Sequence, residues 1–364
     1  MQWNLNVQRQ LTSDTTLTLG YVGSRGVHLL IRGDDGNMTL PVKTAAGYQF
    51  PGDPTTQVNQ ALGVIRYIYW GTDSKYNALN VNLVKTMKHG FQAQVAYSYS
   101  KSLDDDSQSI AGDSFANAIN SPWWFLPHFL RGPSDFDVRH SISINGLWDV
   151  PTPKFSNGFA NAALGGWELG SIVKINSGSP TTPIIGDDPL GLGNTGADQF
   201  GLLNRVPGCD PINHGFAGSA PGAPIWIKNS CYTLPSVSAA TAATLPFPCT
   251  NFPAAPALPA GQVYCANLAG NVSRNSIYGP HLFDLDLSVL KNFPIRSISE
   301  TFNIQFRAEM FNITNHDNFV PPQPGSGDSN ALLFGSDGTS NGPGAIAGLA
   351  TEPREIQFAL KFVW

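Results

Sequence analysis

The sequence predicts an all-β chain, an antiparallel transmembrane β-barrel with long extracellular loops. Three observations predict it: segments of about ten residues alternate apolar and polar side chains, aromatic residues lie at the ends of these segments, and short connections alternate with long ones. A tilted strand needs about 9 to 11 residues to cross a bilayer, whereas strands of soluble proteins average about five or six. We therefore favour a membrane barrel over a secreted all-β protein with aromatic cores.

The composition agrees with this class and excludes others. Charged residues make up 13% of the 364 residues, and glycine (37) and proline (28) are abundant. The mean hydropathy of -0.10 suits strands that turn one apolar face to lipid and one polar face to a lumen. No run approaches the roughly 18 apolar residues of a spanning helix. The net charge of -5 leaves no broad basic surface, so nucleic acid is not expected as a partner.

Nine segments show the alternation clearly, with most apolar residues on one face; the exceptions are Arg9 on the apolar face of the first segment and Ile172 on the second face of 167–176. The clearest pair is 76–88 and 91–100, joined by a tight turn at Lys88, His89 and Gly90. A weaker candidate at 64–70 brings the count to about ten strands. The clear segments are 2–11, 16–21, 76–88, 91–100, 141–145, 167–176, 283–289, 301–309 and 355–364.

The connections between these segments alternate in length, as short periplasmic turns and long extracellular loops do in a barrel. Short turns are expected near Ser13, near His89, and at 151–162 and 294–299. Long loops are expected at 22–63, 104–137, 177–280 and 315–353. The longest, 177–280, is expected to be an extracellular region within one barrel unit that occupies residues 1–364.

All four cysteines lie in this longest loop, at Cys209, Cys231, Cys249 and Cys265. Four cysteines permit three pairings, and the sequence alone does not choose among them. Neighbouring pairing is favoured because it closes two short loops without crossing the Pro/Ala-rich stretch between them. Disulfides indicate an oxidising compartment. A metal site is disfavoured because the loop contains no C-x-x-C spacing.

An acidic run, Asp104 to Asp106, follows the strand at 91–100. Bunched carboxylates could hold Ca²⁺, but the EF-hand spacing is absent, and a solvated loop is the favoured interpretation of Asp104, Asp105 and Asp106. We find no nucleophile elbow, H-E-x-x-H motif, Walker loop or dinucleotide fingerprint in a suitable context. The sequence therefore predicts neither an enzyme nor a cofactor.

The two ends of the chain carry further expectations. At the C-terminus the apolar residues alternate to the last position, which predicts a lipid-facing strand ending in Ile356, Phe358, Leu360, Phe362 and Trp364. At the N-terminus, residues 1–11 have the pattern of a strand and not of an export signal. We therefore expect Met1 to be an internal start in a longer chain, and the strands to be an open part of a larger barrel.

Several segments resemble the large TonB-dependent, Oar-like outer-membrane receptors, which carry a carboxypeptidase-regulatory-like domain before the plug. The segments are YVGSRGVHL (21–29), SKYNALNVNL (74–83), YSYSKSLDD (97–105), GPSDFDVRHSISINGLWDVP (132–151), GWELGSIVKINSGSPTTP (166–183) and FNIQFRAEMFNITNHDNF (302–319). The resemblance implies the outer membrane as location and a barrel of 22 strands in the family, of which this chain holds only part. By this resemblance, the plug, the regulatory-like domain and the TonB-contacting segment of the family are expected to be absent from this chain.

The resemblance also implies partners. The ending IQFALKFVW resembles the C-terminal signal that the barrel-assembly machinery recognises, and TonB would be contacted only through the missing N-terminal region. The expected function is binding and uptake of an unknown bulky nutrient, such as a siderophore, glycan or peptide. The alternatives are a passive outer-membrane pore, if about ten strands close on themselves, and a surface adhesin or lectin-like β protein that acts through its loops.

Overall fold

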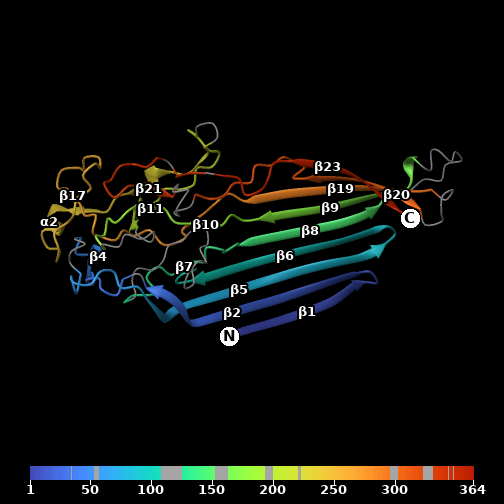
Figure 1. Ribbon diagram of the computed structural model, residues 1–364. Helices are drawn as coiled ribbons and strands as arrows, with labels where there is room; N and C mark the ends of the chain where they lie inside the picture. Colours follow the sequence, from blue (N-terminus) through green and yellow to red (C-terminus); the bar gives the residue numbers. More distant parts are fainter. Residues whose placement is uncertain are drawn as a thin grey trace.

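The fold is a single large antiparallel sheet with a mass of loops at one end (Figure 1). The computed structural model describes residues 1–33, 35–52, 57–107, 125–151, 163–192, 200–219, 223–295, 302–322, 331–342, 344–346 and 348–364. Nine strands lie side by side in chain order, and the short β7 (Gly132–Pro133) also pairs with β6. The nine are β1 (Gln2–Thr12), β2 (Thr15–Gly33), β5 (Tyr67–Lys88), β6 (Phe91–Asp104), β8 (His140–Asp149), β9 (Trp167–Asn176), β19 (Leu282–Pro294), β20 (Asn303–Phe311) and β23 (Glu355–Val363).

The tight turns at one end of the sheet follow from local backbone preferences. His89 and Gly90 both have positive φ, 53° and 75°, which is the requirement of a two-residue turn whose twist matches the flanking strands. This turn sets Lys88 opposite Phe91. The hairpins predicted at Ser13 and His89 are therefore confirmed. The other two predicted turns fall mainly on 152–162 and 296–301, outside the described residues.

One sequence expectation needs correction. The weak candidate at 64–70 is not a separate strand, because β5 runs without a break from Tyr67 to Lys88. Its first part pairs with an equally extended β2, in which Gly33 lies opposite Tyr67. The register shifts between Gly26 and Leu30, beside His28 with a φ of 52°. A bulge of this kind bends a strand and strengthens its twist, so the pattern of alternation breaks although the strand continues.

The pairing register gives the sheet one apolar and one polar face. One row across seven strands joins only apolar or aromatic side chains: Val7, Leu19, Val81, Tyr97, Ile142, Ile175 and Phe283. The adjacent row points to the other face and is mostly polar: Gln8, Thr18, Asn82, Ala96, Ser143, Lys174 and Asp284. Side chains of the apolar face remain exposed, for example Leu19 at 42% and Leu79 at 45%. An exposed apolar sheet face opposite a polar one is the arrangement of a strand between lipid and a lumen.

Aromatic rings and one lysine mark the turn end of the apolar face. Phe91 lies opposite Trp148, and Trp167 lies opposite Lys291. The Lys291 ammonium lies 4.7 Å from the Trp167 ring centre and donates to backbone carbonyls in the connection before β9. An amine that leaves its own strand to reach carbonyls beyond the strand end is the expected behaviour of lysine at a membrane boundary.

Two neighbouring positions of β5 test the assignment of the faces. We expect Val81→Arg to destabilise the assembled protein by about 2–4 kcal/mol, since it places a charge at mid-membrane on the lipid face. Asn82→Arg, one residue further, places the same charge in the lumen and should cost far less. Heat-modifiable gel migration, followed across a denaturant series, measures the difference. Equal losses in the two variants would contradict the assignment.

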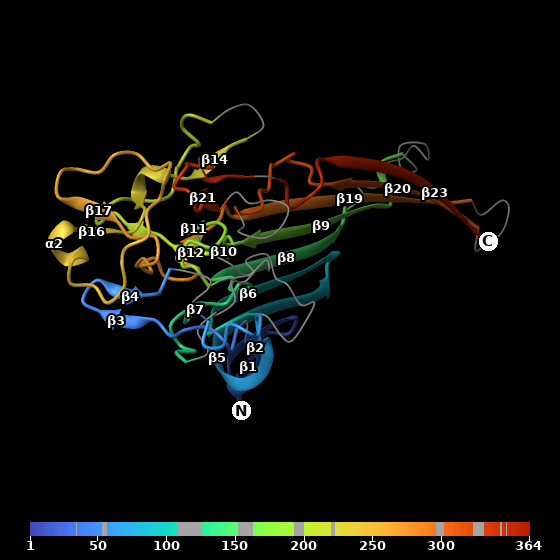
Figure 2. The ribbon, with the colours of Figure 1, turned by 60° about the vertical axis from the view of Figure 1, so that its left-hand side comes forward.

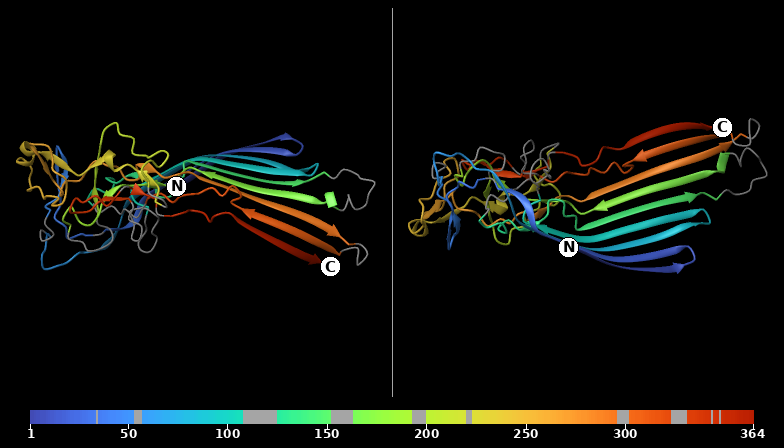
Figure 3. Two further views of the ribbon diagram at one scale, coloured as in Figure 1. Left: turned by 90° about the horizontal axis from the view of Figure 1, so that it is seen from above. Right: turned by 60° about the horizontal axis from the view of Figure 1, so that its bottom comes forward.

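The sheet is curved but open (Figure 3). Within the described chain, β1 pairs only with β2, and β23 pairs only with β20. Every residue of β23 is exposed, and Ile356, Phe358, Leu360 and Phe362 lie opposite Met310, Ala308, Phe306 and Ile304 on the apolar face. The rings of Phe306 and Phe358 stack with centres 6.2 Å apart. Trp364 follows the strand and is 86% exposed.

The long connections gather at the other end of the sheet and contain many short elements (Figure 2). None of the helices in the described segments is long and apolar enough to cross a membrane. The elements are β3 (Val42–Thr44), β4 (Gly47–Gln49), β10 (Pro180–Thr181), β11 (Ile184–Ile185), β12 (Gly201–Leu202), β13 (Asn204–Arg205), β14 (Ile225–Ile227), η1 (Asn229–Cys231), β15 (Tyr232–Thr233), β16 (Ser236–Ser238), α2 (Ala239–Ala242), β17 (Gln262–Tyr264), β18 (Ile277–Tyr278), β21 (Leu332–Phe334) and β22 (Gly344–Ala345).

Candidate functional site

The extracellular connections fold together into one body, which we call the loop assembly. It comprises the described residues of 35–66, 104–139, 177–281 and 312–354. Its largest hydrophobic cluster is built from separate connections: Ile185, Leu203 and Ile227 pack with Leu333, and all four are 0% exposed. Parallel pairing of β11 with β21 joins the same two connections. The described segments of the loop assembly therefore bury a shared core.

Two disulfides lie within the longest connection. They join Cys209 to Cys231 and Cys249 to Cys265, with Cα separations of 5.4 and 4.5 Å. These are the neighbouring pairs that the spacing favours. Cys231 belongs to the largest cluster and Cys265 to a separate one with Val237. Each bridge therefore stabilises a different part of the loop assembly.

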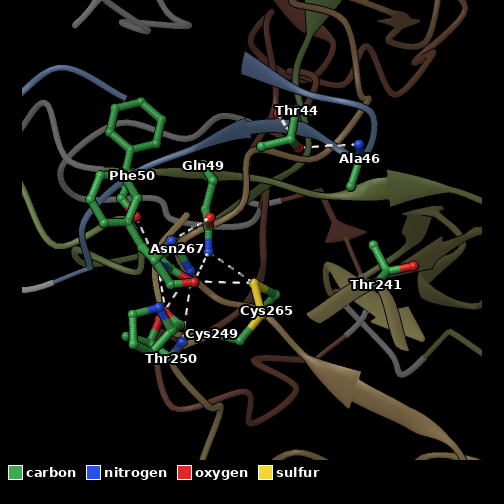
Figure 4. Close-up of a disulfide and its surroundings, with 12 residues drawn as sticks. Thr44, Ala46, Gln49, Phe50, Thr241, Cys249, Thr250, Cys265 and Asn267 are labelled. Carbon is green, nitrogen blue, oxygen red and sulfur yellow. Dashed lines mark hydrogen bonds between the residues drawn. A yellow bond between two sulfur atoms is a disulfide. The ribbon is translucent and has the colours of Figure 1, made fainter. Parts of the chain in front are cut away.

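The first and third connections are joined beside the Cys249–Cys265 bridge (Figure 4). The Asn267 amide donates to the Phe50 carbonyl at 2.8 Å, and its oxygen accepts from the Thr250 amide at 3.1 Å. The Gln49 side chain, which is fully buried, donates to the Phe247 carbonyl at 2.7 Å and accepts from the Phe247 amide at 3.1 Å. The side-chain amides of Asn267 and Gln49 therefore satisfy backbone groups next to the bridge. They also join the β3–β4 hairpin to the longest loop.

The acidic run is buried, so the expectation of a solvated loop was wrong. Asp104, Asp105 and Asp106 are 3%, 0% and 9% exposed. Arg274, itself 1% exposed, binds Asp104 at 2.7 Å and Asp135 at 3.1 Å. A buried charge is stable only when it is paired and hydrogen-bonded, and the partner here lies 170 residues along the chain.

Further ion pairs extend this contact into what we call the rim network. Asp105 binds Arg131 at 3.0 Å and His128 at 2.8 Å. In the same segment Asp137 binds Arg139 at 3.2 Å and accepts from the Tyr278 hydroxyl at 2.8 Å. The rim network comprises Asp104, Asp105, His128, Arg131, Asp135, Asp137, Arg139, Arg274 and Tyr278. It attaches the end of the longest loop to the extracellular end of β6.

Within the rim network, the pKa of the Asp135 carboxyl is shifted from its ordinary value. Burial raises the pKa of its carboxyl above the usual range, and the Arg274 guanidinium opposes this rise. The carboxylates at 104 and 105 are occupied by arginine, and the described residues contain no group of three His, Cys, Asp or Glu placed to hold a metal ion. The rim network is therefore a contact between loop and barrel.

The described part of the loop assembly includes two cavities. One of about 610 Å³ lies beside Cys249 and is lined mainly by the Pro/Ala-rich segment 253–258 together with Phe252 and Tyr264. The other, of about 650 Å³, lies where three connections meet. Both fall in the size range of small-molecule sites in proteins.

The architecture defines an outer-membrane β-barrel, in which an antiparallel sheet has a lipid face, a polar face, tight turns at one end and folded loops at the other. The chain belongs to the outer membrane beta barrel domain family, whose profile matches residues 1–357. It therefore lies in the outer membrane. No curated protein matches it.

Two solved structures match the chain at low similarity. The outer membrane transporter YddB from Escherichia coli is 9% identical with a TM-score of 0.43, over 100% of this chain and 32% of that one. BauA, the ferric preacinetobactin receptor from Acinetobacter baumannii, is 9% identical with a TM-score of 0.37, over 100% of this chain and 29% of that one. The chain thus spans about a third of the length of these proteins.

Proposed function

We propose that this chain supplies the C-terminal strands and the extracellular ligand-binding loops of a TonB-dependent, Oar-like receptor that takes up a bulky nutrient. The loop assembly carries the proposal, because it is one folded body with two disulfides and a buried core rather than a set of independent loops. A surface that is ordered before the ligand arrives avoids the entropic cost of ordering it on binding. An enzymatic role and a cofactor are not part of the proposal.

Closure of the barrel by further strands belongs to the same proposal. In lipid, unpaired backbone groups cost several kcal/mol each, so a spanning sheet has to close. The outer edges of β1 and β23 lack partners among the described strands. Strands from a longer receptor would complete both edges, and its plug domain would occupy the lumen and contact TonB.

Conductance separates the receptor from a passive pore. The protein, extracted from outer membranes and inserted into a planar lipid bilayer, should give no large steady conductance if a plug fills its lumen. Cross-linking in intact cells should also capture TonB. A stable open channel together with no TonB adduct, in cells whose other receptors do cross-link, would favour the pore and refute the proposal.

The C-terminal strand is proposed to be the element that the barrel-assembly machinery recognises. We expect deletion of Trp364 to reduce the amount of assembled, heat-modifiable protein severalfold, because the strand loses the aromatic end of its alternating pattern. Gln357→Ala on the polar face of β23 is the matched control and should assemble normally. The two variants are compared by semi-native gels of outer-membrane fractions. Normal assembly without Trp364 would remove it from the recognition signal.

A further inference from the structure

The cavity where three connections meet has an unusual set of polar groups. It is bounded by the β3–β4 hairpin, by residues 129–130 before β7, and by the two segments 204–207 and 269–273 of the longest loop. Lys43 and Arg205 contribute exposed cationic side chains, and the lining includes no Asp or Glu among the described residues. Within the described chain neither Lys43 nor Arg205 forms an ion pair, whereas other cations of the loop assembly do. In a chain of net charge -5, this cavity is locally cationic.

Two asparagines add oriented hydrogen-bond donors. The Asn271 side-chain oxygen accepts from the Arg205 amide at 2.9 Å, and the Asn204 side-chain oxygen accepts from the Asn271 amide at 3.1 Å. Because each side-chain oxygen accepts from a backbone amide, the NH₂ group of each asparagine is the end left to act as a donor. Neither NH₂ group donates to another described residue. Two cations and two amide donors therefore lie among the lining side chains, and the Arg205 guanidinium also donates to the Cys209 carbonyl at 3.3 Å.

Aromatic rings form an apolar wall of the same cavity. Tyr48 and Phe129 meet edge to face with ring centres 5.5 Å apart, and the Lys43 ammonium lies 5.9 Å from the Tyr48 ring centre. Phe129 and Tyr48 also pack on the buried cluster of Met38 and Phe50, which holds the wall in place. Flat, rigid rings of this kind suit a ligand that has a flat apolar face of its own.

We propose that this cavity binds a carboxylate attached to a ring with a flat apolar face, either the C–H face of a sugar or an aromatic ring. The ammonium, guanidinium and amide NH₂ groups would hold the carboxylate, and Tyr48 and Phe129 would contact the flat face of the ring. Acidic sugar residues at the end of an oligosaccharide and aromatic acids share this chemistry, and the cavity volume admits either. The inference rests on the proposed function, because it names the ligand class of that receptor's loops.

Calorimetry on the protein purified from outer membranes in detergent tests the proposal with matched probes. D-glucuronate is compared with D-glucose, and 4-hydroxybenzoate with 4-hydroxybenzyl alcohol. We expect at least one acid to bind about tenfold or more tightly than its neutral counterpart. Lys43→Gln and Arg205→Gln should each weaken the acid about tenfold, while Arg66→Gln, an exposed cation outside the cavity, should leave it unchanged.

A sharper variant is Asn271→Asp. It keeps the oxygen that accepts from the Arg205 amide but replaces the NH₂ donor by a negative charge in the cavity lining, so it should abolish binding of the acid without unfolding the loop. Intact disulfides on a non-reducing gel check the fold. Failure of both acids to bind, equal binding of acid and neutral probe, or unchanged affinity in Asn271→Asp would each overturn the proposal. Because binding is measured without transport, this outcome is independent of the conductance and TonB tests.

Discussion

Replacing Arg274 by methionine is expected to release the longest extracellular loop from the barrel. The substitution keeps an unbranched side chain but leaves Asp104 and Asp135 buried without their counter-ion. Removing one partner of a buried ion pair typically costs about 3–5 kcal/mol. Since the rim network joins loop to barrel, we expect the loop to become sensitive to proteinase K on intact cells while the strands stay protected. Fragment mapping by mass spectrometry locates the new cleavage sites.

The same variant has an expected pH dependence. Burial already raises the pKa of Asp135, and loss of Arg274 removes the strongest of the groups that oppose this rise. A carboxyl whose pKa is raised by folding stabilises the fold at low pH, and this contribution is lost as the pH rises through the folded-state pKa. The methionine variant should therefore resist protease better at about pH 5 than at about pH 8. Arg66→Met, at an exposed position, is the control and should match the wild type at both pH values.

Replacing each disulfide pair by serines is expected to destabilise the loop assembly by about 3 kcal/mol per bridge. The bridges span 22 and 16 residues, and closing loops of that size removes roughly this much free energy from the unfolded state. Because the two bridges lie in different buried clusters, their effects should add. Removal of both should unfold the loop assembly, as measured by exposure of the segment to protease. Heat-modifiable migration of the barrel should remain.

Reduction of the wild type by dithiothreitol provides the matched comparison, since it should reproduce the serine variants without any substitution. The pairing itself is checked by mass spectrometry of a non-reduced digest. Free thiols, or a peptide linking Cys209 to Cys265, would refute the pairing on which these expectations rest.

The two faces of the sheet could be predicted from the sequence because side chains alternate strictly along a strand. Val81 and Asn82 point to opposite faces in the paired sheet as the period of two requires, and the same holds in each of the clear segments. The prediction failed at 67–70, where the bulge near His28 interrupts the alternation of β2 and its partner. Strand boundaries at bulges depend on pairing with a neighbour, which a local pattern does not contain.

The loop assembly could be predicted only in part. Cysteine spacing favoured the two bridges, because that preference depends on distances along the chain. The acidic run was misinterpreted because its partner, Arg274, lies 170 residues away and belongs to no local motif. Asn267, which joins two connections at Phe50, is 217 residues from its partner and is likewise invisible to pattern reasoning. Contacts of this kind are set by the way the barrel brings its extracellular strand ends together.

The length of β5 has an electrostatic consequence. Its 22 residues span about 70 Å, or about 50 Å of height at a typical tilt, whereas the lipid-facing band of a barrel is about 25 Å tall. The strand is therefore about twice as long as the lipid-facing band requires, and with its turn end at the periplasmic boundary about 25 Å of sheet would stand above the membrane. At about three Debye lengths at physiological ionic strength, that height would place the loop end of the sheet beyond most of the electrostatic field of the membrane surface.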